Sequence, residues 1–255
     1  MRLFYSLLLS LLFAVAASAE TIRVAAAISL KEAVGEIAKS YEKSTGNKVE
    51  FNFGSSGQLM TQIKSGADVD VFISAANKQV DDLLKDKLAD AASRQVVVLN
   101  SLVLVVPADA KDAPATFEAL KEPNVAKVAV GEPKTVPAGQ YAEQVLKALK
   151  LDEALKPKII FGTNVRQVLT YVERGEVSAG IVYLTDAKES GDKVRVVATA
   201  DPKTHEPIVY PGVIVTASKK QDAARKFLAY LATADAKAVF EAKGFTVPED
   251  RPAAK

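Results

Sequence analysis

The hydrophobic positions of this chain follow two alternating patterns. Short apolar runs rich in β-branched residues, typical of strands, alternate with longer stretches in which apolar residues recur every three or four positions, typical of amphipathic helices. This alternation predicts an α/β fold with mostly parallel sheets. The runs predicted as strands cover 21–27, 48–53, 69–75, 95–99, 102–107, 127–131, 158–162, 179–183, 194–199 and 208–216.

Two extended stretches predict that the chain crosses between two lobes. In "LNSLVLVVPADA" one apolar run follows another after only Asn100 and Ser101. In "EPIVYPGVIVT" the run is interrupted by Pro211 and Gly212, and proline cannot donate to a central strand ladder. We therefore expect a strand to leave one sheet and enter another at each place, with a cleft between the lobes.

The N-terminus has the features of a secretory signal peptide. Arg2 precedes an apolar stretch, and Ala17-Ser18-Ala19 supplies small residues before a cleavage site expected after Ala19. The apolar stretch is short for a membrane-spanning helix. Residues 1–19 are therefore predicted to be removed on export to the periplasm.

Composition narrows the classes of function. Removal of the signal peptide leaves about 236 residues and lowers the formal net charge from +2 to +1, which argues against a nucleic-acid-binding surface. The chain has no cysteine. Disulfides, thiol catalysis, thiolate metal sites and lipid attachment at a cysteine are thereby excluded.

Several predicted helices begin with residues suited to capping or to binding an anion. Ser29 with Glu32, and Ser55 with Gln58, have the spacing of capping boxes; Asn164 with Gln167 forms an Asn/Gln version. In "VPAGQYAEQ", proline opens a helix and small residues follow. Each site follows a strand, so all are expected at the sheet edges where ligands of α/β folds bind. Helix N-termini converging there would suit an anion, whereas ordinary capping is the alternative for each one alone.

Five segments carry a family resemblance. They read "VAAAISLKEAVGEIAKSYEKSTG", "FNFGSSGQLMTQIKSGADVDVFISA", "VAVGEPKTVPAGQYAEQVL", "NVRQVLTYVERGEVSAGIVYLTDA" and "VYPGVIV". The similarity extends from about Ile22 to "KGFTVP" and resembles the periplasmic molybdate-binding proteins of bacterial ABC importers. It implies a two-lobed type II periplasmic-binding-protein fold, each lobe a mostly parallel sheet flanked by helices, hinged by crossover strands. Lobe 1 would comprise residues 20–101 and 211–255, and lobe 2 residues 102–210.

The resemblance also implies a ligand set for a tetrahedral oxyanion held by neutral donors. Its positions fall on Ser29 in "AAISL", Ser56 in "FGSSG", Ala138 in "VPAG", Val165 in "TNVRQ" and Tyr183 in "GIVYLTD". The serines would supply hydroxyl and backbone N–H groups, Ala138 and Val165 backbone N–H groups, and Tyr183 its phenol. Ser55 is expected to cap its helix instead.

Other constellations are interpreted as structural. His205, the only histidine, lies in a turn-rich loop that we expect to be exposed, and "FGSSG" lacks the spacing of a nucleophile elbow. Asp68 and Asp70 have no further ligand cluster beside them in the sequence. Arg166, although it follows a predicted ligand position, is expected to point outward or to lie behind the residues that contact the anion, without binding the anion itself.

The predicted function is therefore binding without catalysis. The resemblance implies a monomeric periplasmic protein that captures molybdate, and tungstate with it, for an inner-membrane ABC permease. It implies no cofactor, and molybdenum only as bound molybdate. Two alternatives stay open: the same fold binding another oxyanion such as sulfate or chromate, and an exported serine hydrolase that uses a helix N-terminus as oxyanion hole.

Overall fold

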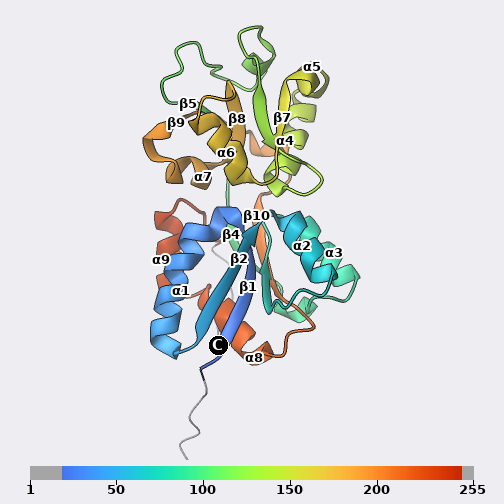
Figure 1. The fold of residues 1–255 in the computed structure, drawn as a ribbon, viewed down its shortest axis with the longest axis vertical. Helices are drawn as coiled ribbons and strands as arrows, with labels where there is room; N and C mark the ends of the chain where they lie inside the picture. Colours follow the sequence, from blue (N-terminus) through green and yellow to red (C-terminus); the bar gives the residue numbers. More distant parts are fainter. Residues whose placement is uncertain (1–18, 249–255) are drawn as a thin grey trace, which may run out of the picture.

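Two five-stranded sheets with flanking helices form the two lobes of the molecule (Figure 1). The computed structural model describes residues 19–248. We call the sheet β2-β1-β3-β10-β4 with its helices lobe 1, and the sheet β7-β6-β8-β5-β9 with its helices lobe 2. The expected two-lobed α/β fold is confirmed.

Lobe 1 lies below in Figure 1. In its sheet, β1 pairs in parallel with β2 and β3, whereas β10 runs antiparallel to β3 and β4. Helices α1 and α9 pack together on one side, and α2 and α3 on the other. The elements are β1 (Thr21–Ala27), α1 (Lys31–Thr45), β2 (Lys48–Gly54), α2 (Ser56–Lys64), β3 (Val71–Ile73), α3 (Asn77–Lys85), β4 (Gln95–Leu99), β10 (Val209–Ile214), α8 (Gln221–Tyr230) and α9 (Ala234–Ala242).

Lobe 2 repeats this arrangement of directions. Strand β6 pairs in parallel with β7 and β8, whereas β5 runs antiparallel to β8 and β9. In each sheet, one strand thus runs against the other four. The elements are β5 (Leu102–Pro107), β6 (Val128–Gly131), α4 (Pro137–Ala148), α5 (Asp152–Leu155), β7 (Ile159–Gly162), α6 (Val165–Glu173), β8 (Ala179–Tyr183), α7 (Leu184–Glu189) and β9 (Val194–Thr199).

Short 3₁₀ turns join several of these elements. The one that matters for the site is η1 (Ile28–Leu30), which separates β1 from α1. The others are η2 (Ala91–Ser93), η3 (Glu118–Lys121), η4 (Lys156–Lys158), η5 (Gly191–Lys193) and η6 (Pro202–Thr204).

Strands β5 and β10 each run against the other strands of their sheet. Strand β5 is the first strand after the chain enters lobe 2, and β10 is the first after it returns to lobe 1. Between β4 and β5, only Asn100 and Ser101 connect the lobes, as the apolar pattern predicted. The interpretation of Pro211 as the second crossing is wrong. Strand β10 lies wholly in the lobe 1 sheet, and its pairing with β4 shifts register between Tyr210 and Pro211. The proline is tolerated because it occupies this irregularity in the ladder.

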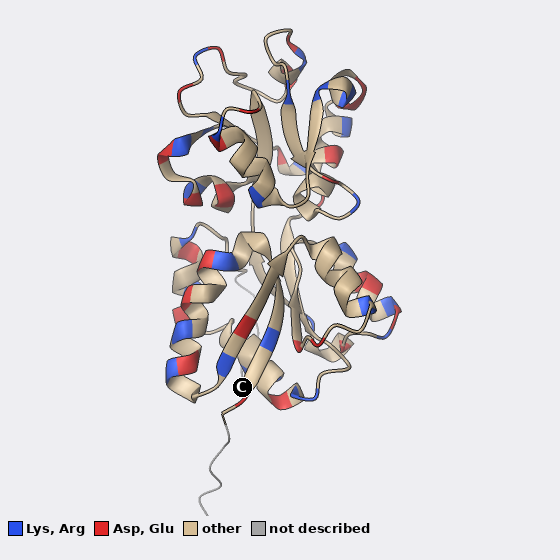
Figure 2. Cartoon of the chain, in the orientation of Figure 1, with Lys and Arg blue, Asp and Glu red and all other residues tan. Residues whose placement is uncertain are grey.

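The strands at the centre of each sheet supply the core. All residues of β5 and β8 are buried, as expected for strands covered by helices on both faces. The edge strand β2 has instead alternating exposure. In Figure 2, basic and acidic residues are interspersed along the outer helices of both lobes. Most charged side chains therefore lie on the surface, and the core is apolar apart from a few buried polar residues such as Asp70 and Asp186.

The predicted signal peptide lies outside the described residues except for Ala19. Within residues 19–248, no helix has the length and apolar character needed to cross a membrane.

Candidate functional site

One small cavity at the junction of the lobes brings together all five predicted ligand positions. Ser29 and Ser56 reach it from lobe 1, and Ala138, Val165 and Tyr183 from lobe 2. The space around it, open solvent included, is about 210 Å³, so the cavity itself is small. The remaining residues that line it are Ala27, Ile28, Gly54, Ser55, Ala75, Val136 and Pro137, so the lining has no charged side chain.

Each of the five positions lies at the beginning of a helix. Ser56 and Val165 are the first residues of α2 and α6, Ala138 is the second of α4, Ser29 lies in η1, and Tyr183 is the N-cap of α7. The first N–H groups of a helix have no acceptor within that helix, and they carry its positive partial charge. This geometry can hold an anion with neutral donors only.

Two buried hydroxyls at the cavity have no hydrogen-bond partner. They belong to Tyr183, which is 1% exposed, and Ser55, which is 3% exposed. A buried hydroxyl without a partner destabilises a folded protein by about 1–3 kcal/mol. Burial raises the pKa of Tyr183 well above its usual value, so its phenol keeps its proton and can donate it to an acceptor.

The expected capping box at Ser29 is wrong. Because η1 precedes it, α1 begins at Lys31 with Leu30 as N-cap, and no side chain caps that end. The Ser29 hydroxyl instead lies 2.9 Å from the hydroxyl of Tyr210, in β10. Ser29 is thereby held at the cavity by a strand that is remote in sequence.

The serine pair of "FGSSG" also differs from expectation. Ser55 occupies the N-cap position of α2, but its side chain makes no capping bond. The Ser56 hydroxyl accepts a hydrogen bond from the Ala75 N–H at 2.9 Å, which leaves its own proton available for a ligand. The side chain of Ser55 is therefore not the cap that the sequence predicted.

Two other helix starts agree with the sequence. Asn164 Oδ1 accepts from the Gln167 N–H at 3.0 Å, and Gln167 Oε1 accepts in return from the Thr163 N–H at 2.6 Å. Pro137 is the first residue of α4. These caps fix the ends of α6 and α4 that face the cavity.

A hydrogen-bonded chain behind Ser29 was not found by sequence reasoning. The Tyr210 hydroxyl contacts Asn100 Nδ2 at 3.2 Å, and Asn100 Nδ2 also donates to the Thr185 hydroxyl at 2.9 Å. Burial raises the pKa of Tyr210, which keeps this hydroxyl neutral. These hydrogen bonds link Asn100, where the polypeptide crosses between the lobes, to the cavity. Its only sequence signal was a tyrosine and an asparagine at the two predicted crossings.

Arg166 is paired with carboxylates and does not line the cavity, as expected. Its Nη2 lies 2.6 Å from Glu32 Oε2, and its Nε lies 2.6 Å from Asp186 Oδ1. Asp186 is fully buried. Burial raises the pKa of this carboxyl to about 6, although Arg166 lowers it. The charged side chains of Arg166, Glu32 and Asp186 are thus paired with one another outside the cavity lining.

The remaining candidates have structural roles. Asp70 accepts from the Arg23 N–H at 2.8 Å and from the Ser218 hydroxyl at 2.6 Å, while Asp68 pairs with the Arg23 guanidinium. His205 is partly buried rather than exposed, and its ring packs against Tyr141. Within the described part of the chain, no cluster of three His, Asp or Glu side chains could hold a metal ion.

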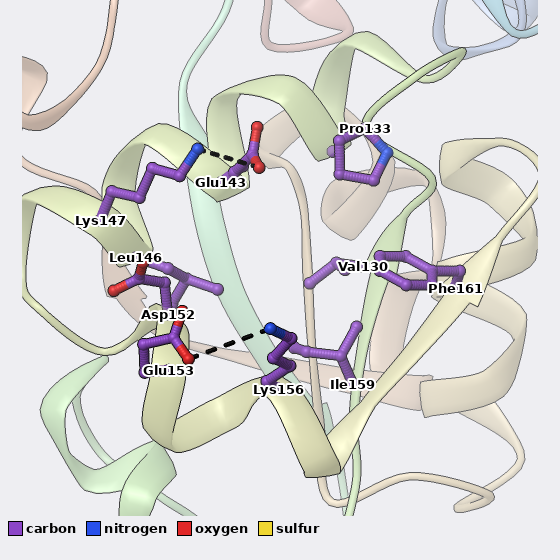
Figure 3. A pocket seen from close by; sticks show the side chains of 11 residues that line it. Val130, Pro133, Glu143, Leu146, Lys147, Asp152, Glu153, Lys156, Ile159 and Phe161 are labelled. Carbon is purple, nitrogen blue, oxygen red and sulfur yellow. Dashed lines mark ion pairs between the residues drawn. The ribbon is translucent and has the colours of Figure 1, made fainter.

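A larger pocket on lobe 2 contains none of the predicted ligand residues (Figure 3). It lies between α4, α5 and β7, and its floor is apolar. Charged residues at its rim pair with one another: Lys147 with Glu143 at 3.0 Å, and Lys156 with Glu153 at 4.0 Å. It therefore lacks the free donors of the cavity between the lobes.

Comparison with known proteins gives one consistent result. Residues 22–246 match the family described as bacterial extracellular solute-binding protein. The molybdate-binding protein ModA of Haemophilus influenzae is 41% identical over 92% of this chain and 92% of its own length. ModA of Escherichia coli is 38% identical over 93% of this chain and 95% of its own. The solved periplasmic molybdate-binding protein of Azotobacter vinelandii superposes with a TM-score of 0.80 at 25% identity, covering 89% of this chain and all of that one.

Proposed function

Because this chain belongs to the family of bacterial extracellular solute-binding proteins, we propose that it captures molybdate between its lobes and delivers it to an ABC permease. The ModA relatives, similar over nearly their whole length, support molybdate as the ligand. The proposal includes export to the periplasm, cleavage after Ala19, a monomeric state and no catalysis. The family is one of transport binding proteins, which agrees with this role.

One observation carries the proposal. Five residues at helix starts, drawn from both lobes, line one cavity that has no charged side chain. A dianion with four oxygens needs several converging donors, and helix N-termini supply them without a cation. The unpartnered Tyr183 phenol is a donor of this kind.

We assign the donors as follows. Ser29 and Ser56 contribute hydroxyl and backbone N–H groups, Ala138 and Val165 contribute backbone N–H groups, and Tyr183 contributes its phenol. Because Ser56 already accepts from Ala75 and Ser29 lies against Tyr210, both hydroxyls are oriented before the ligand arrives. Donors fixed in advance lose little entropy on binding.

The hinge lies at the chain crossings. We place it at Asn100–Ser101 and in the segment that leads into β10. The ligand contacts are complete only when the lobes are closed, so molybdate binds that state more tightly and shifts the equilibrium toward it. A contact that favours closure is the hydrogen bond from the Gly57 N–H of lobe 1 to the Thr135 carbonyl of lobe 2, at 2.9 Å.

Isothermal titration of residues 20–255 with molybdate, tungstate, sulfate and chromate tests the proposal. We expect saturable one-to-one binding of molybdate and weaker binding of sulfate. Ser56→Ala should weaken molybdate binding by about 1–3 kcal/mol, because a buried donor to the anion is lost. Absence of molybdate and tungstate binding would refute the proposal, and labelling of Ser56 by a fluorophosphonate would favour a hydrolase instead.

A further inference from the structure

Ser55 is a polar side chain that neither the fold nor the proposed ligand set uses. It is 3% exposed, it lines the cavity between the lobes, and its hydroxyl has no partner. Serine at an N-cap usually accepts a hydrogen bond from the N–H of the second or third helical residue. Here the backbone has the extended conformation of an N-cap, with φ −70° and ψ 143°, and yet no capping bond forms.

The position of Gly57 gives a physical reason. Gly57 is the second residue of α2, so its N–H is one of the two donors that an N-cap serine would take. In this structure that N–H donates across the junction to the Thr135 carbonyl at 2.9 Å. Closure of the lobes thus occupies a donor that would otherwise hold the Ser55 hydroxyl.

From this geometry we infer that Ser55 is a further ligand-binding residue, whose hydroxyl donates directly to the oxyanion in the closed protein. The inference rests on the proposed function of the cavity. An oxyanion offers only acceptor atoms, so the Ser55 hydroxyl donates its proton to it. Ser56 differs, because its oxygen already accepts from Ala75. The two adjacent serines therefore have different roles. The Ser56 hydroxyl is held in place before the ligand binds, whereas the Ser55 hydroxyl becomes available to the ligand when the lobes close.

This assignment makes an unusual prediction for Ser55→Ala. A capping serine stabilises the ligand-free protein, so its loss lowers Tm without changing affinity. A ligand-binding hydroxyl contributes to affinity as well, so its loss lowers molybdate affinity about tenfold or more. The ligand-free Tm does not separate the two roles, because open lobes leave the Gly57 N–H free to hold the Ser55 hydroxyl.

Thr233→Ala is the matched control. Thr233 is the N-cap of α9, and its hydroxyl accepts from the Ala236 N–H at 3.4 Å, away from the cavity. In this variant the ligand-free Tm falls and the affinity is retained. Both variants are made in residues 20–255 and measured by thermal denaturation and by titration with molybdate. If Ser55→Ala does not fold, Ser55→Gly replaces it, because glycine is tolerated at an N-cap and also lacks the hydroxyl.

The inference is overturned if the Ser55 variant binds molybdate within twofold of the wild type, as Thr233→Ala is expected to do. Failure of the proposed function is a different result. In that case the wild-type protein itself binds neither molybdate nor tungstate.

Discussion

Arg166 and Glu32, which are 134 positions apart, join the two lobes through a two-pronged ion pair. Arg166 Nη2 lies 2.6 Å from Glu32 Oε2, and Nη1 lies 3.4 Å from Oε1. The side chains are only 23% and 30% exposed, so solvent screens the pair less than at an open surface. Because Arg166 directly follows Val165, this contact positions the start of α6 at the cavity between the lobes.

Glu32→Gln should therefore weaken ligand binding by destabilising closure. The variant loses the charge that Arg166 meets across the junction while the ligand donors stay in place. We expect molybdate affinity to fall about 3- to 10-fold, the range for a partly buried pair. Titration calorimetry measures it. Glu50→Gln is the control, because Glu50 is 65% exposed and pairs with Arg23 of the same lobe; equal affinities of the two variants would contradict a closing role.

Gly57→Ala should prevent full closure. A Cβ at Gly57 would lie 2.6 Å from the Thr135 carbonyl oxygen and 2.7 Å from its Cα, both backbone atoms of the other lobe. Closing against them would cost about 1–3 kcal/mol, which weakens molybdate binding by about 5- to 150-fold. The ligand-free protein should keep its Tm, since open lobes avoid the contact.

Gly35→Ala is the control for this experiment. Nothing lies within 4 Å of a Cβ at Gly35, which is inside α1. Alanine favours the helix by about 0.5–1 kcal/mol, so Tm should rise while affinity is unchanged. A Gly57→Ala variant that binds as tightly as Gly35→Ala would show that the lobes need not approach this closely.

Tyr183→Phe should separate binding from stability. The phenol is buried without a partner, so its removal leaves the ligand-free protein as stable as the wild type or more stable. Binding of molybdate should weaken by about 1–3 kcal/mol because one donor is lost. Chemical denaturation and titration measure the two effects. Tyr230→Phe on α8 serves as the control and should leave affinity intact; a Tyr183 variant with unchanged affinity would remove the phenol from the ligand set.

Asp186 should make stability depend on pH between about 4 and 6. Burial raises the pKa of its carboxyl from 3.8 to about 6, with Arg166 opposing the rise. The folded state therefore binds this proton more tightly than the unfolded state. Its contribution to the free energy of unfolding is present below pH 4 and is lost as pH rises through 6.

Urea denaturation of Asp186→Asn across pH 4–7 measures this contribution. The stability of the wild type relative to the variant should be greatest near pH 4 and should decline toward pH 7. Asp192→Asn removes an exposed aspartate from the same lobe and should show no such trend. A constant difference between wild type and Asp186→Asn would argue against a buried, titrating carboxyl.

Most of the fold was predictable because its signals are local. The β-branched runs at 21–27 and 102–107 coincide with β1 and β5, and Pro137 opens α4 as its fixed φ requires. The connection between the lobes at Asn100–Ser101 was likewise predictable from the sequence, because two apolar runs separated by two residues leave no room for a helix between the strands. Pro211 was misinterpreted. A proline within a strand indicates an irregular hydrogen-bond ladder, but it does not show whether the strand changes sheets at that point.

The sequence did not predict the hydrogen bonds around the candidate site. Ser29, Ser56, Ala138, Val165 and Tyr183, which the resemblance implies as ligand residues, line one cavity, and their role in binding stays a prediction. The capping assignments failed at Ser29 and Ser55, because each hydroxyl or its expected donor meets a residue from a remote element. Tyr210 competes for the first, and Thr135 takes the Gly57 N–H beside the second.

The sequence by itself determined the alternation of strands and helices, the link from one lobe to the other, and the small and hydroxyl residues at the helix starts, because each depends on neighbours within a few positions. Only the tertiary structure decided which of these groups meet. The pairing of Arg166 with Glu32, the contact of Gly57 with Thr135 and the unpartnered hydroxyl of Ser55 arise where two lobes close on each other. Hydrogen bonds and ion pairs act over a few ångströms, and residues more than 70 positions apart come within that range only after the chain has folded.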